Sequence, residues 1–111
     1  MKRRDHGEKA VRLRRSLEKL DAKVDYEMVI ETCFAAAVQR LACITETRRQ
    51  IHRDSHKGLA QFLEEADLAD LAVLFRELDS LRTSRFYGGQ KDGGAPRRAL
   101  EVLDEIETHL H

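Results

Sequence analysis

Large apolar residues recur at steps of three and four along this chain, and this spacing constrains the fold more than any other feature. The longest such series comprises Leu68, Leu71, Leu74, Phe75, Leu78 and Leu81. Residues at these steps share one face of an α-helix, whereas a half-buried strand would alternate every second residue. The series predicts a long amphipathic helix that follows Asp67 as its N-cap and stops near Gly88.

Two further series precede it. The first predicts a surface helix with one buried side and comprises Ala10, Leu13, Leu17 and Leu20. Asp25 can cap a second helix, whose apolar surface between Met28 and Ile44 is too wide for a single contact. We expect this helix to lie at the centre of a bundle, where the small residues of the range 35–37 let another helix approach closely. Beyond Ile44 the sequence becomes polar, and we expect the helix to end there.

The rest of the chain also reads as helical. Ser55 can cap a short helix through Leu63, which turns three apolar residues inward: Leu59, Phe62 and Leu63. Pro96 suits the first turn of a last helix, whose buried residues are expected to be Ala99, Val102, Leu103, Ile106 and Leu110. No strand-like alternation or internal repeat competes with this interpretation. The sequence predicts an all-α fold, an antiparallel up-and-down bundle of four main helices plus one short helix, with residues 1–111 as a single domain.

Charge is segregated along the chain although its formal net charge is zero. Residues 1–23 hold nine basic and four acidic side chains, whereas residues 64–81 hold one basic and six acidic side chains. This alternation favours contacts between segments, between subunits or with a charged partner. The apolar series of residues 68–78 is also more than one neighbouring helix covers easily, so we expect a homodimer.

Cysteine usage and the N-terminus point to a cytoplasmic protein. Cys33 and Cys43 are ten residues apart, which places them on different faces of a helix, and we expect both to be buried thiols of a reducing compartment. The first residues are charged and lack the apolar stretch of a signal peptide, and no run approaches the length of a membrane span.

Four segments in order resemble the HEPN family of small helical-bundle proteins. They are the inward helix around Phe34 with its small neighbours, the run Ser55-His56-Lys57-Gly58-Leu59 before a short helix, the helix end with Arg82 and Phe86-Tyr87, and the closing helix from Ala95 to Leu110. The resemblance extends from Phe34 to Leu110. It implies a helical bundle that often forms homodimers, and a possible role as a binding protein or toxin–antitoxin component beside a nucleotidyltransferase-type partner.

The resemblance also bears on activity. The ribonuclease branch of the family carries an arginine and a histidine that are separated by four to six intervening residues, and the histidine handles protons. Here Tyr87 follows Arg82 in that place, and a tyrosine with an ordinary pKa of about 10 is a poor general base at neutral pH. The alternative function is a metal-independent ribonuclease with a site at this helix end, for which Arg82, Tyr87 and His56 are the catalytic candidates.

Binding of RNA or a nucleotide needs side chains that contact phosphate but, unlike cleavage, no general base. The candidates for contact with phosphate are Arg82, Arg85, Tyr87, Lys57 and Lys91. A structural role for Arg82 is the competing interpretation, in which it pairs with an acidic residue such as Asp79 or Glu101.

Three other sequence patterns are weaker indications of function. Arg49 and His56 match the spacing of the ribonuclease motif but precede the short helix, the wrong place for it. His52 and His56 are four apart, yet no third zinc ligand accompanies them. The loop from Gly88 to Gly94 lacks the ending of a phosphate-binding loop and is interpreted as a connection. We therefore expect neither a metal nor a cofactor.

Overall fold

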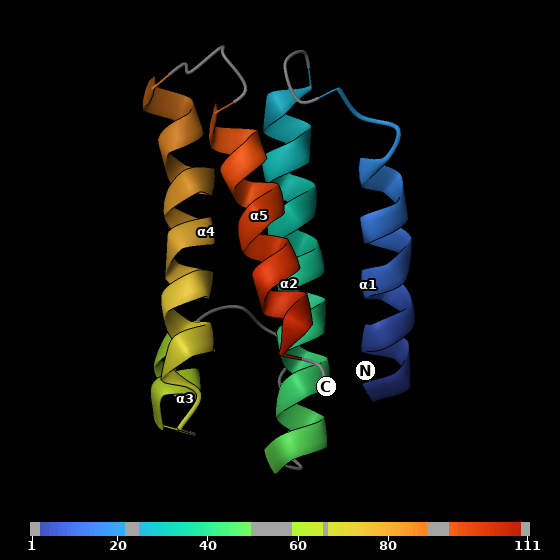
Figure 1. Cartoon of the computed structure of the whole chain (residues 1–111), viewed down its shortest axis with the longest axis vertical. Helices are drawn as coiled ribbons and strands as arrows, with labels where there is room; N and C mark the ends of the chain where they lie inside the picture. The colour runs from blue at the N-terminus through green and yellow to red at the C-terminus, as the bar shows by residue number, and fades with distance from the viewer. Residues whose placement is uncertain (1–2, 22–24, 50–58, 66, 89–93, 110–111) are drawn as a thin grey trace.

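The computed structural model describes residues 3–21, 25–49, 59–65, 67–88 and 94–109, which form five helices and no strand (Figure 1). The helices are α1 (Arg3–Leu17), α2 (Tyr26–Arg49), α3 (Leu59–Glu65), α4 (Ala69–Gly88) and α5 (Gly94–Thr108). The four long helices run alternately up and down the molecule, and α3 lies at one end beside the start of α4. The predicted bundle of four main helices plus one short helix is confirmed.

Helix α2 holds the bundle together. It packs against α1 on one side and against α4 and α5 on the other, as its wide apolar surface predicted. The fully buried Ala36 and Ala37 present small surfaces at these contacts, whereas Ala35 stays partly exposed. Among the described helices, α1 brings its backbone close to α2 alone, and it stands apart at one edge of the molecule (Figure 1).

The core lies between α2, α4 and α5, with α3 closing one end. Its fully buried large residues include Ile30, Leu41, Leu63, Leu78, Leu103 and Ile106. The rings of Phe34 and Phe75 join α2 to α4, with centroids 5.4 Å apart and planes inclined by 30°. Full burial of one such aliphatic side chain contributes about 1.5–3 kcal/mol, so the apolar series supplies the dominant favourable term in folding.

The described apolar residues that predicted α1 and α5 lie on the inward faces of these segments, as expected. Ala10 and Leu17 are buried and Leu13 and Leu20 pack against the core. Pro96 lies in the first turn of α5, which begins two residues earlier at Gly94.

The end of α2 differs from the prediction, because the helix continues past Ile44 to Arg49. The segment after Ile44 contains no glycine or proline, so nothing interrupts the backbone hydrogen bonds although the side chains are polar. The end of the apolar pattern therefore does not mark the end of α2. Helix α1 runs from Arg3 to Leu17, so Leu20, the last residue of its apolar series, lies beyond the helix.

Asp25 starts α2, but through its backbone. Its carbonyl accepts the N–H of Val29 at 2.9 Å, while its carboxylate accepts the N–H of Asp21 at 2.9 Å. The side chain of Asp25 thus bonds to Asp21 and not to the first turn of the helix.

Asp67 ends α3, and the prediction that it caps α4 is wrong. Its φ of 62° lies in the left-handed region. Its N–H donates to the carbonyl of Glu64 at 3.3 Å, and the N–H of Leu68 donates to the carbonyl of Leu63 at 2.8 Å. These two bonds and the left-handed residue form a Schellman motif, in which Leu63 and Leu68 also supply the accompanying apolar pair. Helix α4 starts from Leu68, whose carbonyl accepts the N–H of Ala72 at 3.1 Å.

The apolar series that motivated the homodimer is covered within one chain. Leu68, Leu71, Phe75 and Leu78 are buried, and Leu74 packs against the core. Helix α4 contacts α2, α3 and α5, so three neighbours share a surface that a single helix could not cover. Of the described residues, Val11, Met28 and Val73 are the exposed large apolar ones, and they belong to three different helices. Scattered single residues of this kind are normal on a protein surface, and the homodimer stays a prediction.

None of the described helices is both long enough and apolar enough to cross a membrane. The predicted cap Ser55 and the inward residue Leu110 lie outside the described residues.

Candidate functional site

Arg82 is the one predicted site residue whose side chain the structure describes. His56, Lys57 and Lys91 lie outside the described residues. Arg85 and Tyr87 belong to α4, but their side chains are outside the description as well. Of the predicted site, the structure therefore describes the surroundings of Arg82 alone, and the site itself stays a prediction.

Asp79 and Phe34 are described neighbours that hold the guanidinium of Arg82. Its Nη2 donates to Oδ1 of Asp79 at 3.1 Å, one turn earlier in α4, and its Cζ lies 4.1 Å from the centroid of the Phe34 ring on α2. The side chain remains 30% exposed. Of the two acidic partners considered for Arg82, Asp79 is confirmed, whereas Glu101 lies near Arg98 at 3.8 Å. Stacking on an aromatic ring contributes about 0.5–2 kcal/mol and the exposed ion pair about 0–1 kcal/mol, so the ring contact is the stronger restraint on Arg82.

Arg82 borders an open pocket on the outer face of α2, between α1 and α4. The pocket has a volume of about 320 Å³. Its apolar lining consists of Leu13, Phe34, Ala35 and Val38, and its polar lining consists of Lys9, Glu31, Gln39 and Arg82. The pocket exists because α1 and α4 both pack against α2 without approaching each other.

A buried histidine stands behind this pocket, and the sequence interpretation missed it. His6 is 1% exposed, and its Nδ1 lies 2.7 Å from Oε1 of Gln39. An amide oxygen only accepts hydrogen bonds, so Nδ1 carries the hydrogen and donates it. The signal was present in the sequence, because His6 lies four residues before Ala10 and extends the apolar series of α1 by one turn.

Cys33 lies beneath a group of charged side chains that joins α1, α2 and α5. Arg14 pairs with Asp104 and lies 3.7 Å from Glu107, which in turn is 3.6 Å from Arg40. Burial raises the pKa of the Cys33 thiol to about 12. Such a thiol stays protonated at neutral pH and does not act as a nucleophile. The predicted burial holds for Cys33, but Cys43 is only partly buried.

A second charged contact fastens α5 to α4. Arg98 donates from Nε to Oε2 of Glu77 at 2.5 Å and from Nη2 to Oε1 at 2.8 Å. This paired hydrogen bond lowers the pKa of the Glu77 carboxyl. Arg98 also donates to Glu105 at 3.3 Å. The paired hydrogen bond between Arg98 and Glu77 joins α5 to α4, and we call this contact the clamp.

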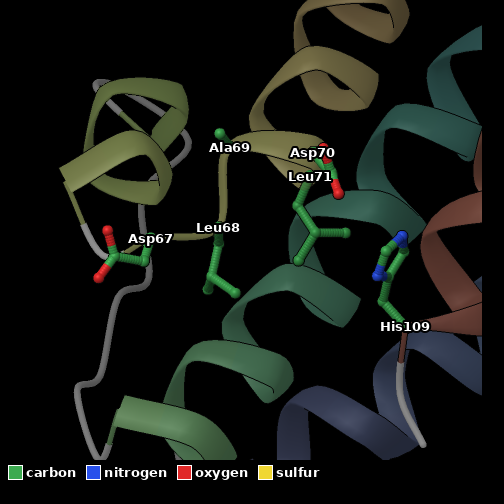
Figure 2. A pocket seen from close by; sticks show the side chains of 6 residues that line it. All are labelled: Asp67, Leu68, Ala69, Asp70, Leu71 and His109. Carbon is green, nitrogen blue, oxygen red and sulfur yellow. The ribbon is translucent and has the colours of Figure 1, made fainter.

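Another pocket, of about 220 Å³, lies where α3 meets α4 and α5 ends (Figure 2). Its titratable lining consists of Asp67, Asp70 and His109. The side chain of Asp67 points away from the other two, beyond Leu68 (Figure 2). Within the described ranges no group of three His, Cys, Asp or Glu side chains could hold a metal ion.

The candidate site is the pocket between α1 and α4. Lys9, Arg82, Glu31 and Gln39 surround its apolar floor, and the guanidinium of Arg82 is stacked on Phe34. Comparison with known proteins assigns it no function, since no family model, no curated protein and no solved structure matches this chain.

Proposed function

We propose that this chain is a cytoplasmic HEPN-like binding protein or toxin–antitoxin component that acts with a nucleotidyltransferase-type partner. The proposal rests on the order of four sequence segments, from the helix around Phe34 to the closing helix that ends near Leu110. The five helices are compatible with it, since the segments that carry the resemblance include α2, α3, α4 and α5.

The observation that favours binding over cleavage is the restrained guanidinium of Arg82. It is stacked on Phe34, hydrogen-bonded to Asp79 and still 30% exposed. A group fixed in this way meets a carboxylate or phosphate of a partner without first losing rotamer entropy, which favours association. Catalysis at the same place would also require a base within hydrogen-bonding reach of the reacting hydroxyl.

Co-purification tests the pairing. The tagged full chain is expressed in its native cells, and the captured proteins are identified by mass spectrometry together with the product of the adjacent gene. We expect a nucleotidyltransferase-type protein to be captured, and we expect Arg82→Ala to weaken its binding at least about tenfold, equivalent to ~1.4 kcal/mol.

Arg76→Ala is the matched control, because Arg76 lies on the same helix and pairs with Glu64 of α3, away from the pocket. Equal loss in both variants would show that general destabilisation of α4 and not contact at Arg82 is responsible. Failure to capture any nucleotidyltransferase, with an unrelated adjacent gene, would overturn the pairing.

The ribonuclease alternative has a separate test. The purified chain is incubated with single-stranded and structured RNA in the presence of a chelator. Cleavage that survives chelation and is lost in both Arg82→Ala and Tyr87→Phe would establish a metal-independent nuclease at this helix end. Intact RNA, or cleavage unchanged by both substitutions, would reject that mechanism.

A further inference from the structure

The polar lining of the pocket between α1 and α4 is rich in hydrogen-bond donors. Lys9 and Arg82 approach it from α1 and α4, and Glu31 is the one carboxylate among its lining residues. Lys9 has no ion pair with any residue in the described parts of the chain. The polar lining therefore favours a ligand that brings acceptors and negative charge.

His6 determines which end of the Gln39 amide can serve such a ligand. The Oε1 atom of Gln39 accepts the hydrogen bond from Nδ1 of the buried His6. The atom that remains for hydrogen bonding at the pocket is then the NH₂ group, a pure donor. A third donor thus joins the ammonium and the guanidinium, and its orientation depends on a side chain that does not line the pocket.

The remaining lining gives the ligand an apolar body. Leu13 and Val38 contribute aliphatic surface beside Phe34, whose ring is already covered by the Arg82 guanidinium at 4.1 Å. The volume of about 320 Å³ falls at the small end of the range for ligand pockets, which suits a compact molecule.

We propose that this pocket binds a small organic anion, a carboxylate or phosphate on a compact apolar body, and that His6 is a positioning residue that turns the Gln39 amide toward it. Lys9 and Arg82 contact the anionic group, and the apolar floor covers the body. Arg82 serves both this inference and the proposed function, whereas the apolar floor, Lys9 and the pair formed by His6 and Gln39 belong to this inference alone.

Phenyl phosphate is the first probe, followed in ¹H–¹⁵N NMR titrations of the full chain. We expect saturable shifts of amides in the ranges 9–13 and 31–39 with a Kd on the order of 1 mM. Benzoate should bind similarly. Inorganic phosphate lacks the apolar body, and benzyl alcohol and benzylammonium lack the negative charge, so each should bind at least about tenfold more weakly.

Gln39→Glu isolates the donor. The new carboxylate still accepts from Nδ1 of His6, so the contact between α1 and α2 persists, but an anionic oxygen replaces the NH₂ group. We expect the Kd for phenyl phosphate to rise at least about tenfold with unchanged helical circular dichroism. Lys9→Gln should weaken binding severalfold, whereas Lys19→Gln, an exposed lysine of the same segment outside the pocket, should leave it unchanged.

The role of His6 is read from the side-chain NH₂ resonances of Gln39. His6→Leu removes the donor at similar volume, so it should shift those resonances and raise the Kd severalfold. His6→Asn restores an N–H donor close to the place of Nδ1 and should recover most of the affinity. If the affinity of the His6 variants for phenyl phosphate follows their thermal stability and not the presence of an N–H donor at residue 6, His6 does not position the Gln39 amide.

Two results would overturn the proposed anion site as a whole. Equal binding of benzyl alcohol and phenyl phosphate would overturn it, as would the absence of saturable shifts at about 10 mM probe. None of the substitutions at residues 6, 9 and 39 changes Arg82, so their effect on partner capture can be measured separately. Loss of anion binding with normal capture, or the reverse, separates this inference from the proposed function.

Discussion

Replacing Asp67 by glycine should stabilise the protein, whereas the same replacement three residues later at Asp70 should destabilise it. Asp67 has a φ of 62° at the end of α3, where a residue without Cβ is favoured. Asp70 is an exposed residue in the first turn of α4. The two positions are close in sequence and alike in charge, so the sign of the effect depends on backbone conformation.

The magnitudes follow from the geometry at each position. Relief of the left-handed conformation at Asp67 is worth about 1 kcal/mol, and the greater freedom of glycine in the unfolded chain offsets roughly half of it. We expect a net gain of about 0.5 kcal/mol. At Asp70, glycine lowers helix propensity and removes a favourable charge at the helix N-terminus, which together cost about 1 kcal/mol. Asp67→Val should cost at least about 1 kcal/mol, since a β-branched side chain tolerates positive φ poorly.

Thermal and urea unfolding followed by circular dichroism measure these changes. For a chain of this size, about 4 °C in Tm corresponds to 1 kcal/mol, so we expect a rise of about 2 °C for Asp67→Gly and a fall of about 4 °C for Asp70→Gly. Equal losses in the two glycine variants would refute the left-handed assignment, and with it the Schellman motif that joins α3 to α4.

Three further predictions concern the core, the clamp between α4 and α5, and the two thiols. Leu103→Ala should lower the free energy of unfolding by about 2–5 kcal/mol in urea titrations, because Leu103 is fully buried in α5, and a loss under 1 kcal/mol would contradict its place in the core. The hydrogen bond from Arg98 lowers the folded-state pKa of Glu77, so the clamp contributes stability above the ordinary carboxyl pKa of 4.5 and loses it as the pH falls through the lowered value. Glu77→Gln should therefore reduce Tm at pH 7 and have little effect near pH 2, whereas an equal reduction at both pH values would show that the ion pair is not responsible. A thiol reagent at pH 8, monitored by mass spectrometry, should modify Cys43 in the native protein and Cys33 after unfolding, because burial raises the pKa of Cys33 to about 12; rapid native modification of Cys33 would contradict that burial.

Apolar spacing predicted the helices and most of their buried faces, because burial of large side chains dominates folding energy. The series in α4 and α5 placed Leu78 and Ile106 correctly in the core. Spacing failed where the determining interaction is a hydrogen bond. Aspartate is a common N-cap residue, but it also tolerates the left-handed conformation found after a helix. Which of these two roles Asp67 takes depends on the carbonyls that lie within reach of the backbone N–H groups.

The candidate site was predicted in part for a similar reason. Arg82 was identified, and its pairing with Asp79 follows from their three-residue spacing on a helix. Its stacking on Phe34 joins α4 to α2 and needs a three-dimensional fold. His6 was missed because a titratable residue one turn before the first apolar residue of a series is not counted as part of it, and because its partner Gln39 lies far along the chain. The pocket itself arises from the separation of α1 and α4, which no local pattern encodes.

Because α1 contacts the backbone of α2 alone among the described helices, we expect it to unfold locally before the rest of the bundle. Helices α2, α4 and α5 support one another through shared contacts. Of the described helices, only α2 comes close to the backbone of α1, and side chains such as Arg14 reach from α1 to α5. In native-state hydrogen exchange, the amides of α1 should therefore open as one unit at a lower free energy than those of α2. Each such opening removes one wall of the pocket, so ligand occupancy and protection of α1 from exchange should rise together.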